Sequence, residues 1–351
     1  MLNWLLVCIP VAVALEHFAP HRHSWIFIAS GLAIVPLAAW MGHATEHLAE
    51  RTGEGVGGFL NATFGNAAEL IIALAALRSG LHEVVKASLA GSIIGNILLV
   101  LGAAMLAGGM KFSEQRFNAL GARSQATMLT LAAIALMALG AYGFAAGTDA
   151  RFDMHSVSIA IAVVLLVSYG LDLLFSLITH RRLFSGTSVG AESETQPWSV
   201  GKAAGILAGA TVLIAWMSEI LVGAIEPAAH AWGMNSVFVG VFVVAILGNA
   251  AEHSTAVLVA MKDRMDLALS IAIGSSVQVA VFVAPVLVFA SLWIGPQPMD
   301  LAFKPGLVLA VFLSVLITGQ VSGDGESNWI KGIQLLAVYV ILGIVFFFLP
   351  Q

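Results

Sequence analysis

Charged residues are scarce in this chain of 351 residues. Only 10% of the residues are Asp, Glu, Lys or Arg, and 59% are apolar, whereas soluble domains contain about 25% charged residues. The net charge of −5 offers no basic surface for nucleic acid. The one cysteine, Cys8, allows no intramolecular disulfide. These absences exclude a soluble globular enzyme, a disordered chain and a nucleic-acid-binding protein.

The apolar residues are gathered in runs long enough to cross a lipid bilayer, which takes roughly 20 residues. We identify eleven such runs, and they predict an all-α polytopic membrane protein. The fourth and ninth runs, which begin at Val84 and Leu267, are long enough to tilt or break. The runs cover approximately residues 2–18, 24–44, 56–77, 84–110, 125–146, 155–179, 200–225, 235–261, 267–294, 303–321 and 329–349.

Lys and Arg in the short loops predict the orientation, because these residues concentrate on the cytoplasmic side. Ten of them fall inside and five outside when the N-terminus is placed inside. We therefore expect the N-terminus inside and the C-terminus outside, and the compact chain indicates a prokaryotic cytoplasmic membrane. The first run has no basic segment before it, so we interpret it as a retained helix. The polar segment 181–199 is expected to be a cytoplasmic linker.

The chain contains an internal repeat. The sequence GNAAE occurs at residues 65–69 and again at residues 248–252, an offset of 183. The same offset aligns Gly57 with Gly240, and Gly91-Ser92 with Gly274-Ser275. The third run aligns with the eighth, so five runs separate the copies. An odd number of spans inverts the second copy relative to the first, which is an architecture typical of secondary transporters.

This repeat predicts the domain organisation. Residues 1–23 form a peripheral first transmembrane helix, and residues 24–180 form the first inverted five-helix repeat. Residues 181–199 are the cytoplasmic linker, and residues 200–351 form the second inverted repeat.

Each copy of GNAAE places a carboxylate near the middle of a membrane span. Glu69 lies in the third run and Glu252 in the eighth, and no Lys or Arg lies mid-span to pair with either. An ionisable group at the centre of a span costs about 2.5–3.5 kcal/mol on insertion scales. A bound cation or protons must therefore neutralise the two groups. The simpler alternative is that each carboxyl stays protonated and hydrogen-bonded.

The surrounding residues offer oxygen ligands, which suit hard divalent cations such as Ca²⁺, Mg²⁺ or Mn²⁺. Each Glu is preceded by an Asn on the same helix face, and each glycine can expose a carbonyl where a helix opens. The neighbouring His253 points away from the face of Glu252 and is expected to be a packed histidine. The predicted metal ligands are Glu69, Glu252, Asn66, Asn249, Gly65, Gly248, Ser92, Ser275 and Gln278.

Two neighbouring carboxylates cannot both ionise easily without a cation, so protons and the cation compete for the same oxygens. Competition at one site with alternating exposure produces antiport. Glu46 and Glu219 are expected near the cytoplasmic ends of the second and seventh spans. They are candidates for gating or proton transfer, or for anchoring helix ends.

The two GNAAE segments resemble the signature repeats of the calcium/proton exchangers, within the cation/calcium exchanger superfamily. The segments MGHATEHL at residues 41–48 and GDGESNW at residues 323–329 are also similar to segments of that family. The resemblance implies eleven spans, one peripheral helix followed by two inverted repeats. It implies Ca²⁺ as the transported substrate, with Glu69 and Glu252 as ligands and proton carriers, and it implies gating or proton transfer by Glu46 and Glu219.

Our hypothesis is a secondary Ca²⁺/H⁺ antiporter whose substrates are Ca²⁺ and protons and whose surroundings are the lipid bilayer. A sodium/calcium exchanger is the nearest alternative, and a channel is another. An alternative from a different class is an intramembrane zinc protease, because His43, Glu46 and His47 match the H-x-x-E-H pattern. The sequence leaves a homo-oligomer open.

Overall fold

The computed structural model describes residues 3–52, 57, 60, 63–146, 150–180 and 198–349. Helices dominate it, as expected of a chain in lipid, where every backbone polar group must be satisfied within the protein. Among these described residues, eight helices are long and apolar enough to cross a membrane, and two shorter apolar helices cover Asn3–Phe18 and Pro305–Val321. Each of the eleven predicted runs contains a helix, so the prediction of a polytopic helical membrane protein is confirmed.

The chain forms two compact units that do not follow the halves of the sequence, because each unit contains segments from both. Unit 1 comprises residues 1–88, 190–251 and 347–351, and unit 2 comprises residues 89–189 and 252–346. The boundaries of the two repeats stay a prediction.

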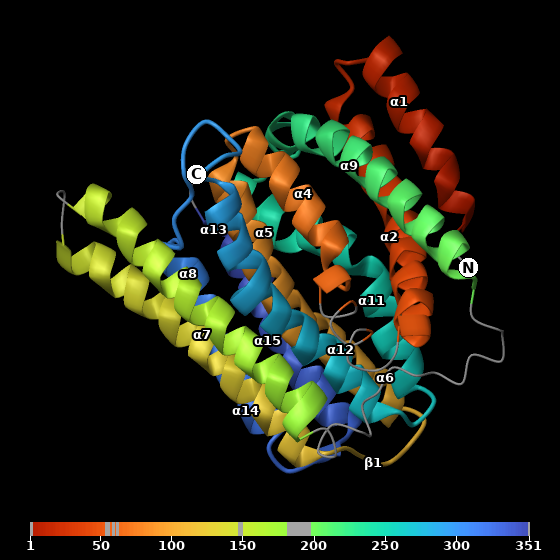
Figure 1. Cartoon of the computed structure of the whole chain (residues 1–351), viewed down its shortest axis with the longest axis vertical. Helices are drawn as coiled ribbons and strands as arrows, with labels where there is room; N and C mark the ends of the chain where they lie inside the picture. The colour runs from red at the N-terminus through yellow and green to blue at the C-terminus, as the bar shows by residue number, and fades with distance from the viewer. Residues whose placement is uncertain are drawn as a thin grey trace. The chain divides into compact units, whose positions relative to one another are not determined.

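Unit 1 is built around two long helices, α2 (His23–Thr52) and α9 (Val200–Ala231), which lie against each other (Figure 1). The Phe27 and Trp232 rings contact each other at one end of the pair, with centroids 5.5 Å apart. At the other end the His47 and Trp198 rings lie 4.5 Å apart. The two helices are therefore antiparallel. The remaining elements of unit 1 are η1 (Asn3–Val7), α1 (Cys8–Phe18), α4 (Ala67–Arg78), α10 (Ser236–Phe238) and η6 (Val239–Val244).

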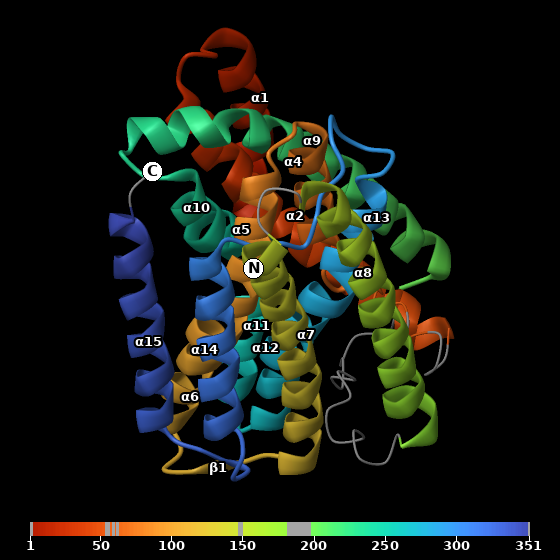
Figure 2. The ribbon, with the colours of Figure 1, turned by 90° about the vertical axis from the view of Figure 1, so that its left-hand side faces the viewer.

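Two helices begin in unit 1 and continue into unit 2, namely α5 (His82–Ile94) and α11 (Ala245–Ala260). In unit 2 the helices α7 and α14 lie against each other (Figure 2). The other helical segments of unit 2 are η2 (Gly95–Val100), α6 (Leu101–Gly109), α7 (Ala119–Ala146), α8 (Ala150–Leu174), η4 (Phe175–Thr179), α12 (Met265–Gln278), η7 (Val279–Val283), α13 (Ala284–Ala290), α14 (Pro305–Val321) and α15 (Trp329–Phe348).

Within the described residues the only strands are β1 (Gln115–Arg116) and β2 (Glu326–Ser327). They pair antiparallel, with Gln115 opposite Ser327 and Arg116 opposite Glu326. This two-residue ribbon connects the loop after α6 with the loop after α14.

The fourth and ninth predicted spans each contain a π-helical stretch. In the fourth, η2 lies between α5 and α6, and in the ninth η7 lies between α12 and α13. The helices α5 and α12 begin at His82 and Met265, which are 183 residues apart, the offset of the sequence repeat. Both runs continue as helices through this stretch, over His82–Gly109 and Met265–Ala290, so neither of them breaks, and the π-helical stretches lie at corresponding places in the two copies.

Candidate cation-binding site

Glu69 lies in the first turn of α4, with 5% of its surface exposed. The helix begins at Ala67, after a turn at Gly65 and Asn66, and Asn66 has non-helical angles of φ −99° and ψ 22°. The predicted opening of the helix at Gly65 is therefore present in the first copy. Asn66 is buried as well, at 4% exposure, so the turn keeps two polar side chains out of solvent.

Glu252 lies at the middle of α11, and here the prediction that a helix opens at the glycine was wrong. Gly248 is inside the regular part of α11, so its carbonyl is not released by a break. The irregular segment of the second copy is η6, which ends one residue before α11 begins at Ala245. Asn249 is 3% exposed, and its side-chain amide donates to the carbonyl of Ala245 at 3.0 Å.

Gly248 of α11 lies next to α4 within unit 1. A Cβ placed there would lie 3.6 Å from Cδ1 of Ile72, an ordinary van der Waals contact, so packing in unit 1 does not require a glycine at this position.

The Glu252 carboxylate accepts a hydrogen bond from the Ser275 hydroxyl of α12. Its Oε2 atom is buried and has no hydrogen-bond partner in the part of the chain that the structure describes. A carboxylate oxygen without a partner inside a protein is costly. The position therefore suits a proton or a cation. Ser275 lies beside Glu252, and its role as a metal ligand stays a prediction.

The other predicted oxygen ligands lie on the fourth and ninth spans, in α5 and α12. Ser92 is buried in α5 at 1% exposure, and Gln278 is the last residue of α12, directly before η7. Ser276 donates to the carbonyls of Ala272 at 2.9 Å and of Ile93 at 3.5 Å. Ile93 and Ser276 are 183 residues apart, so equivalent positions of the two copies touch in unit 2.

Sequence reasoning missed one polar residue next to this site. The Nε2 atom of His253 and the Oδ1 atom of Asn96, at the start of η2, are 3.0 Å apart. The expectation that His253 is a packed histidine is consistent with this contact. Asn96 is 1% exposed in an otherwise apolar segment, and that isolated amide was the signal in the sequence.

The helices that carry the two glutamates end in the same way. After α4, the amide of Leu81 donates to Ala76 O at 2.9 Å and Gly80 has φ +74°. After α11, the amide of Arg264 donates to Val259 O at 3.0 Å and Asp263 has φ 59°. Both ends are Schellman turns with a left-handed residue after the helix. Each pair of corresponding residues is 183 positions apart, so the repeat extends to backbone conformation.

The expected positions of Glu46 and Glu219 near the same side of the membrane were wrong. Thr211 of α9 lies beside Met41 of α2, with Oγ1 and Sδ 3.8 Å apart. Because the helices are antiparallel, Glu46 and Glu219 lie in opposite directions from this level, roughly 20 Å apart along the axis. Glu219 forms an ion pair with Arg78 at the end of α4, with a distance of 2.8 Å.

The residues of the H-x-x-E-H pattern do not gather around one point. The Nδ1 atom of His43 lies 3.4 Å from Glu46, whereas that of His47 lies 3.5 Å from Glu50. No group of three or more His, Cys, Asp or Glu side chains able to hold a metal ion occurs among the described residues. The geometry therefore gives the zinc protease alternative no support.

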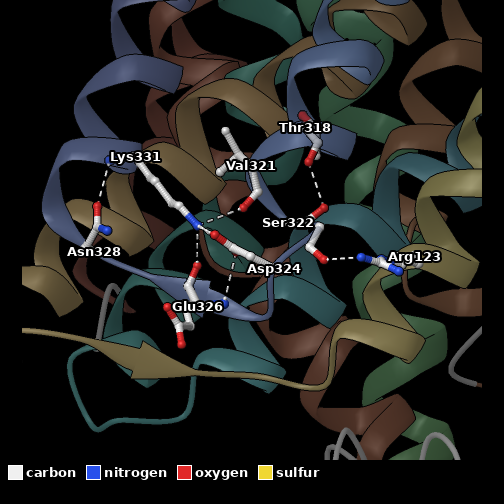
Figure 3. A network of polar contacts seen from close by, with 9 residues as sticks. Arg123, Thr318, Val321, Ser322, Asp324, Glu326, Asn328 and Lys331 are labelled. Carbon is white, nitrogen blue, oxygen red and sulfur yellow. Dashed lines mark hydrogen bonds and ion pairs between the residues drawn. The ribbon is translucent and has the colours of Figure 1, made fainter.

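A polar network that the sequence did not predict lies between α14 and α15 (Figure 3). The ammonium group of Lys331 donates to both carboxylate oxygens of Asp324, at 2.7 and 2.6 Å, and to the carbonyls of Val321 and Glu326 at 3.2 and 2.7 Å. This hydrogen-bonded ammonium holds the pKa of the exposed Asp324 carboxyl below its usual value. Arg123 of α7 donates to Gly323 O at 2.6 Å and attaches the same loop to a third helix.

Glu69 lies in unit 1 and Glu252 in unit 2, so their meeting around one cation stays a prediction. Within the units, the structure brings together Glu252 with Ser275, and it buries Glu69, Asn66, Asn249 and Ser92. These residues supply carboxylate, amide and hydroxyl oxygens, the ligands that Ca²⁺ prefers.

Comparisons with known proteins give a consistent result. The family model of the sodium/calcium exchanger proteins matches residues 22–178 and again residues 202–348, once in each half. The chain is 46% identical over 359 residues to a Ca²⁺/H⁺ antiporter of Aphanothece halophytica, covering 99% of this chain and 96% of that protein. It is 42% identical to the Ca²⁺/H⁺ antiporter ChaA of Bacillus subtilis strain 168, covering 92% of each.

A solved structure has a similar fold. The structure of native YfkE superposes with a TM-score of 0.85 at 37% sequence identity, covering 99% of this chain and 100% of that one. Its similarity extends over the whole length, including the segments that carry both glutamates.

Proposed function

Because the chain belongs to the sodium/calcium exchanger protein family, we propose that it is a Ca²⁺/H⁺ antiporter of the cytoplasmic membrane. It is a transporter that exports cytoplasmic Ca²⁺ in exchange for protons. The relatives named as Ca²⁺/H⁺ antiporters, which match over 92–99% of this chain, support the choice of substrates. The observation that carries the proposal is the buried Glu252 carboxylate, which shares one hydrogen bond with Ser275 and keeps a second oxygen without a partner among the described residues.

In this proposal Glu69 and Glu252 bind Ca²⁺ or protons in competition. Loss of the cation leaves two carboxylates in a low-dielectric region, where at least one must take up a proton. Binding of Ca²⁺ releases that proton, so the two substrates use the site in turn. Asn66, Asn249, Ser92, Ser275 and Gln278, together with the carbonyl of Gly65, complete the set of oxygen ligands. Gly248 lies within the regular helix α11 and is therefore left out of this set.

Access alternates as the long helices α2 and α9 move against the rest of the protein. These two helices share an extended antiparallel contact within unit 1, so they are suited to move together. Glu46 and Glu219, which lie at levels of the pair roughly 20 Å apart along the axis, would then act at different depths in the membrane. The N-terminus lies inside and the C-terminus outside in this arrangement.

Flux measurements in proteoliposomes test the proposal. An outwardly or inwardly directed pH gradient should drive Ca²⁺ movement against its own gradient, and a sodium gradient alone should not. Transport driven by sodium alone would overturn the choice of proton and favour a sodium/calcium exchanger. Passive Ca²⁺ flow that ignores the pH gradient would favour a channel.

Substitutions at the two glutamates test the mechanism. Glu69→Gln and Glu252→Gln should each abolish exchange, because an amide neither binds Ca²⁺ with a charge nor carries the exchanged proton. Glu114→Gln is the matched control, since Glu114 is exposed in the loop after α6 and has no part in the proposal. Normal Ca²⁺-driven proton flux in either buried variant, with normal protein yield, would refute the mechanism.

A further inference from the structure

The two Schellman turns differ in the residue at the left-handed position, and that difference requires an explanation. The left-handed position is Gly80 after α4 and Asp263 after α11. Glycine adopts a positive φ without steric cost, whereas a residue with a Cβ is strained there. The backbone alone therefore favours glycine in both copies. The second copy carries an aspartate instead, so its side chain is expected to have a task.

The side chain of Asp263 contacts Gln115. The amide nitrogen Nε2 of Gln115 donates to Oδ1 of Asp263 at 2.9 Å and also to the carbonyl of Ala260 at 2.9 Å. Ala260 is the last residue of α11, whose terminal carbonyls have no partner within the helix. One glutamine amide thus joins the last turn of α11 to the left-handed residue that follows it.

Gln115 is itself held in one place. It is 1% exposed and belongs to the strand β1, where it pairs with Ser327. Its Oε1 atom lies over Gly108, in the last turn of α6, where an added Cβ would collide with it. The helix α6, the ribbon and the end of α11 therefore fix the glutamine from three directions, all within unit 2.

A second contact acts on the same helix end. The ammonium group of Lys111 donates to the carbonyl of Met261 at 3.3 Å. A cation at the C-terminus of a helix is favourable because the carbonyls there carry partial negative charge. The loop 110–118 thus provides two separate donors to the end of α11, and only Gln115 also contacts the aspartate.

We propose that Gln115 and Asp263 form a positioning pair that fixes α11 along its axis and about it, and thereby sets the place of Glu252. This inference rests on the proposed function, since it assigns the pair a role in Ca²⁺ exchange. Glu252 is eleven residues before Asp263, roughly 16 Å along a straight helix. Because a helix is stiff over this length, a displacement of its end moves the carboxylate as well. Both residues act through α11 and do not touch the transported ion.

Replacement of Asp263 by glycine separates this role from simple structural stability. Asp263→Gly removes the carboxylate and at the same time relieves the strained backbone, so the relief offsets the lost hydrogen bond and the thermal midpoint in detergent should change little. The proposal expects the Ca²⁺ concentration for half-maximal exchange to increase about threefold to tenfold, the effect of losing one hydrogen bond. A purely structural role for residue 263 expects wild-type exchange.

Three further variants complete the test. Gln115→Met keeps the size of the side chain but removes the donor, and its effect should be at least as large as that of Asp263→Gly, because it also loses the bond to the Ala260 carbonyl. Asp263→Asn keeps an acceptor oxygen and tolerates the left-handed conformation, so it should exchange Ca²⁺ like the wild type. The double variant Asp263→Gly with Gln115→Met should be no worse than Gln115→Met alone, since that single variant has already lost the contact with Asp263.

The outcomes distinguish this inference from the proposed function. Wild-type protein that shows no proton-driven Ca²⁺ exchange would overturn the proposed function. Wild-type protein that exchanges Ca²⁺, together with unchanged half-saturation in Asp263→Gly and in Gln115→Met, would overturn the positioning pair alone. An Asp263→Gly variant with lower transport and a little-changed thermal midpoint supports it.

Discussion

A methyl group added at Gly240 should damage the packing next to α11, and removal of the methyl group of Ala87 should restore it. Gly240, in η6, faces the backbone of α5. A Cβ at this position would lie 2.7 Å from Cβ of Ala87, 3.2 Å from Val84 O and 3.3 Å from the Ser88 amide nitrogen. Carbon atoms pack best about 3.5–4.0 Å apart, so the added methyl group is roughly 1 Å too close.

The magnitude follows from the atoms that the new methyl group meets. Two of the three nearest atoms belong to the backbone of a helix, and Ala87 is fully buried, so no flexible side chain can move aside. Overpacking of this kind costs about 1–3 kcal/mol. Gly240→Ala should therefore lower the thermal midpoint, which is measured by unfolding in detergent. Gly209→Ala in α9 is the matched control, because nothing lies within 4 Å of its added Cβ.

The double variant Gly240→Ala with Ala87→Gly places the methyl group on the opposite helix. It should recover most of the loss and stay within about 1 kcal/mol of the wild type, the cost of a glycine inside a helix. A Gly240→Ala variant as stable as the Gly209→Ala control would refute the close approach of η6 to α5. A double variant less stable than both single variants would refute the assignment of the clash to Ala87.

Two further predictions concern ion pairs at helix ends. Lys331→Met should destabilise the protein at pH 7 by about 1–2 kcal/mol, mostly through lost bonds to carbonyls, since the Asp324 carboxylate is exposed. The pKa of Asp324 is lowered in the folded protein, so its share is present above the ordinary carboxyl value of about 3.9 and is lost as the pH falls through the lowered folded value. Unfolding curves of both proteins between pH 7 and pH 3 should therefore converge partly, and parallel curves would contradict this share. Arg78→Met should cost less than about 1 kcal/mol, because both partners of its pair with Glu219 are exposed. If Glu219→Gln reduces exchange more than Arg78→Met does, its carboxylate acts beyond the ion pair; equal effects would leave Glu219 only an anchoring role.

The spans could be predicted from the sequence because hydropathy is averaged over about 20 residues, so no single residue decides whether a run is apolar enough. It also predicted the relation between the copies, since GNAAE contains polar residues that a lipid environment does not otherwise select. The break before α4 followed from Gly65 and Asn66. The regular course of α11 through Gly248 did not, because the same five residues begin a helix in one copy and continue one in the other.

The contacts between loops were beyond reach of the sequence. The ribbon of β1 and β2 joins residues more than 200 positions apart and is only two residues long in each strand, so no periodic pattern indicates it. The side chains of Gln115 and Lys331 likewise donate to backbone carbonyls. Every residue has such a carbonyl, so the sequence does not indicate which one is the acceptor. The position of Glu219 could have been predicted from the direction of each span. In an inverted repeat, equivalent spans run in opposite directions, so equivalent residues lie toward opposite ends of them.

The hydrogen bond from Ser276 to the carbonyl of Ile93 illustrates how a chain with two repeated halves differs from an assembly of two identical subunits. In a symmetric dimer a residue on the rotation axis meets its own copy, so any change there is made on both sides at once. A single chain is free of that constraint and places a hydroxyl opposite a carbonyl, with an isoleucine side chain in the matching position. This protein can therefore carry different side chains at two equivalent positions that contact each other. A homodimer built from either half could not do so.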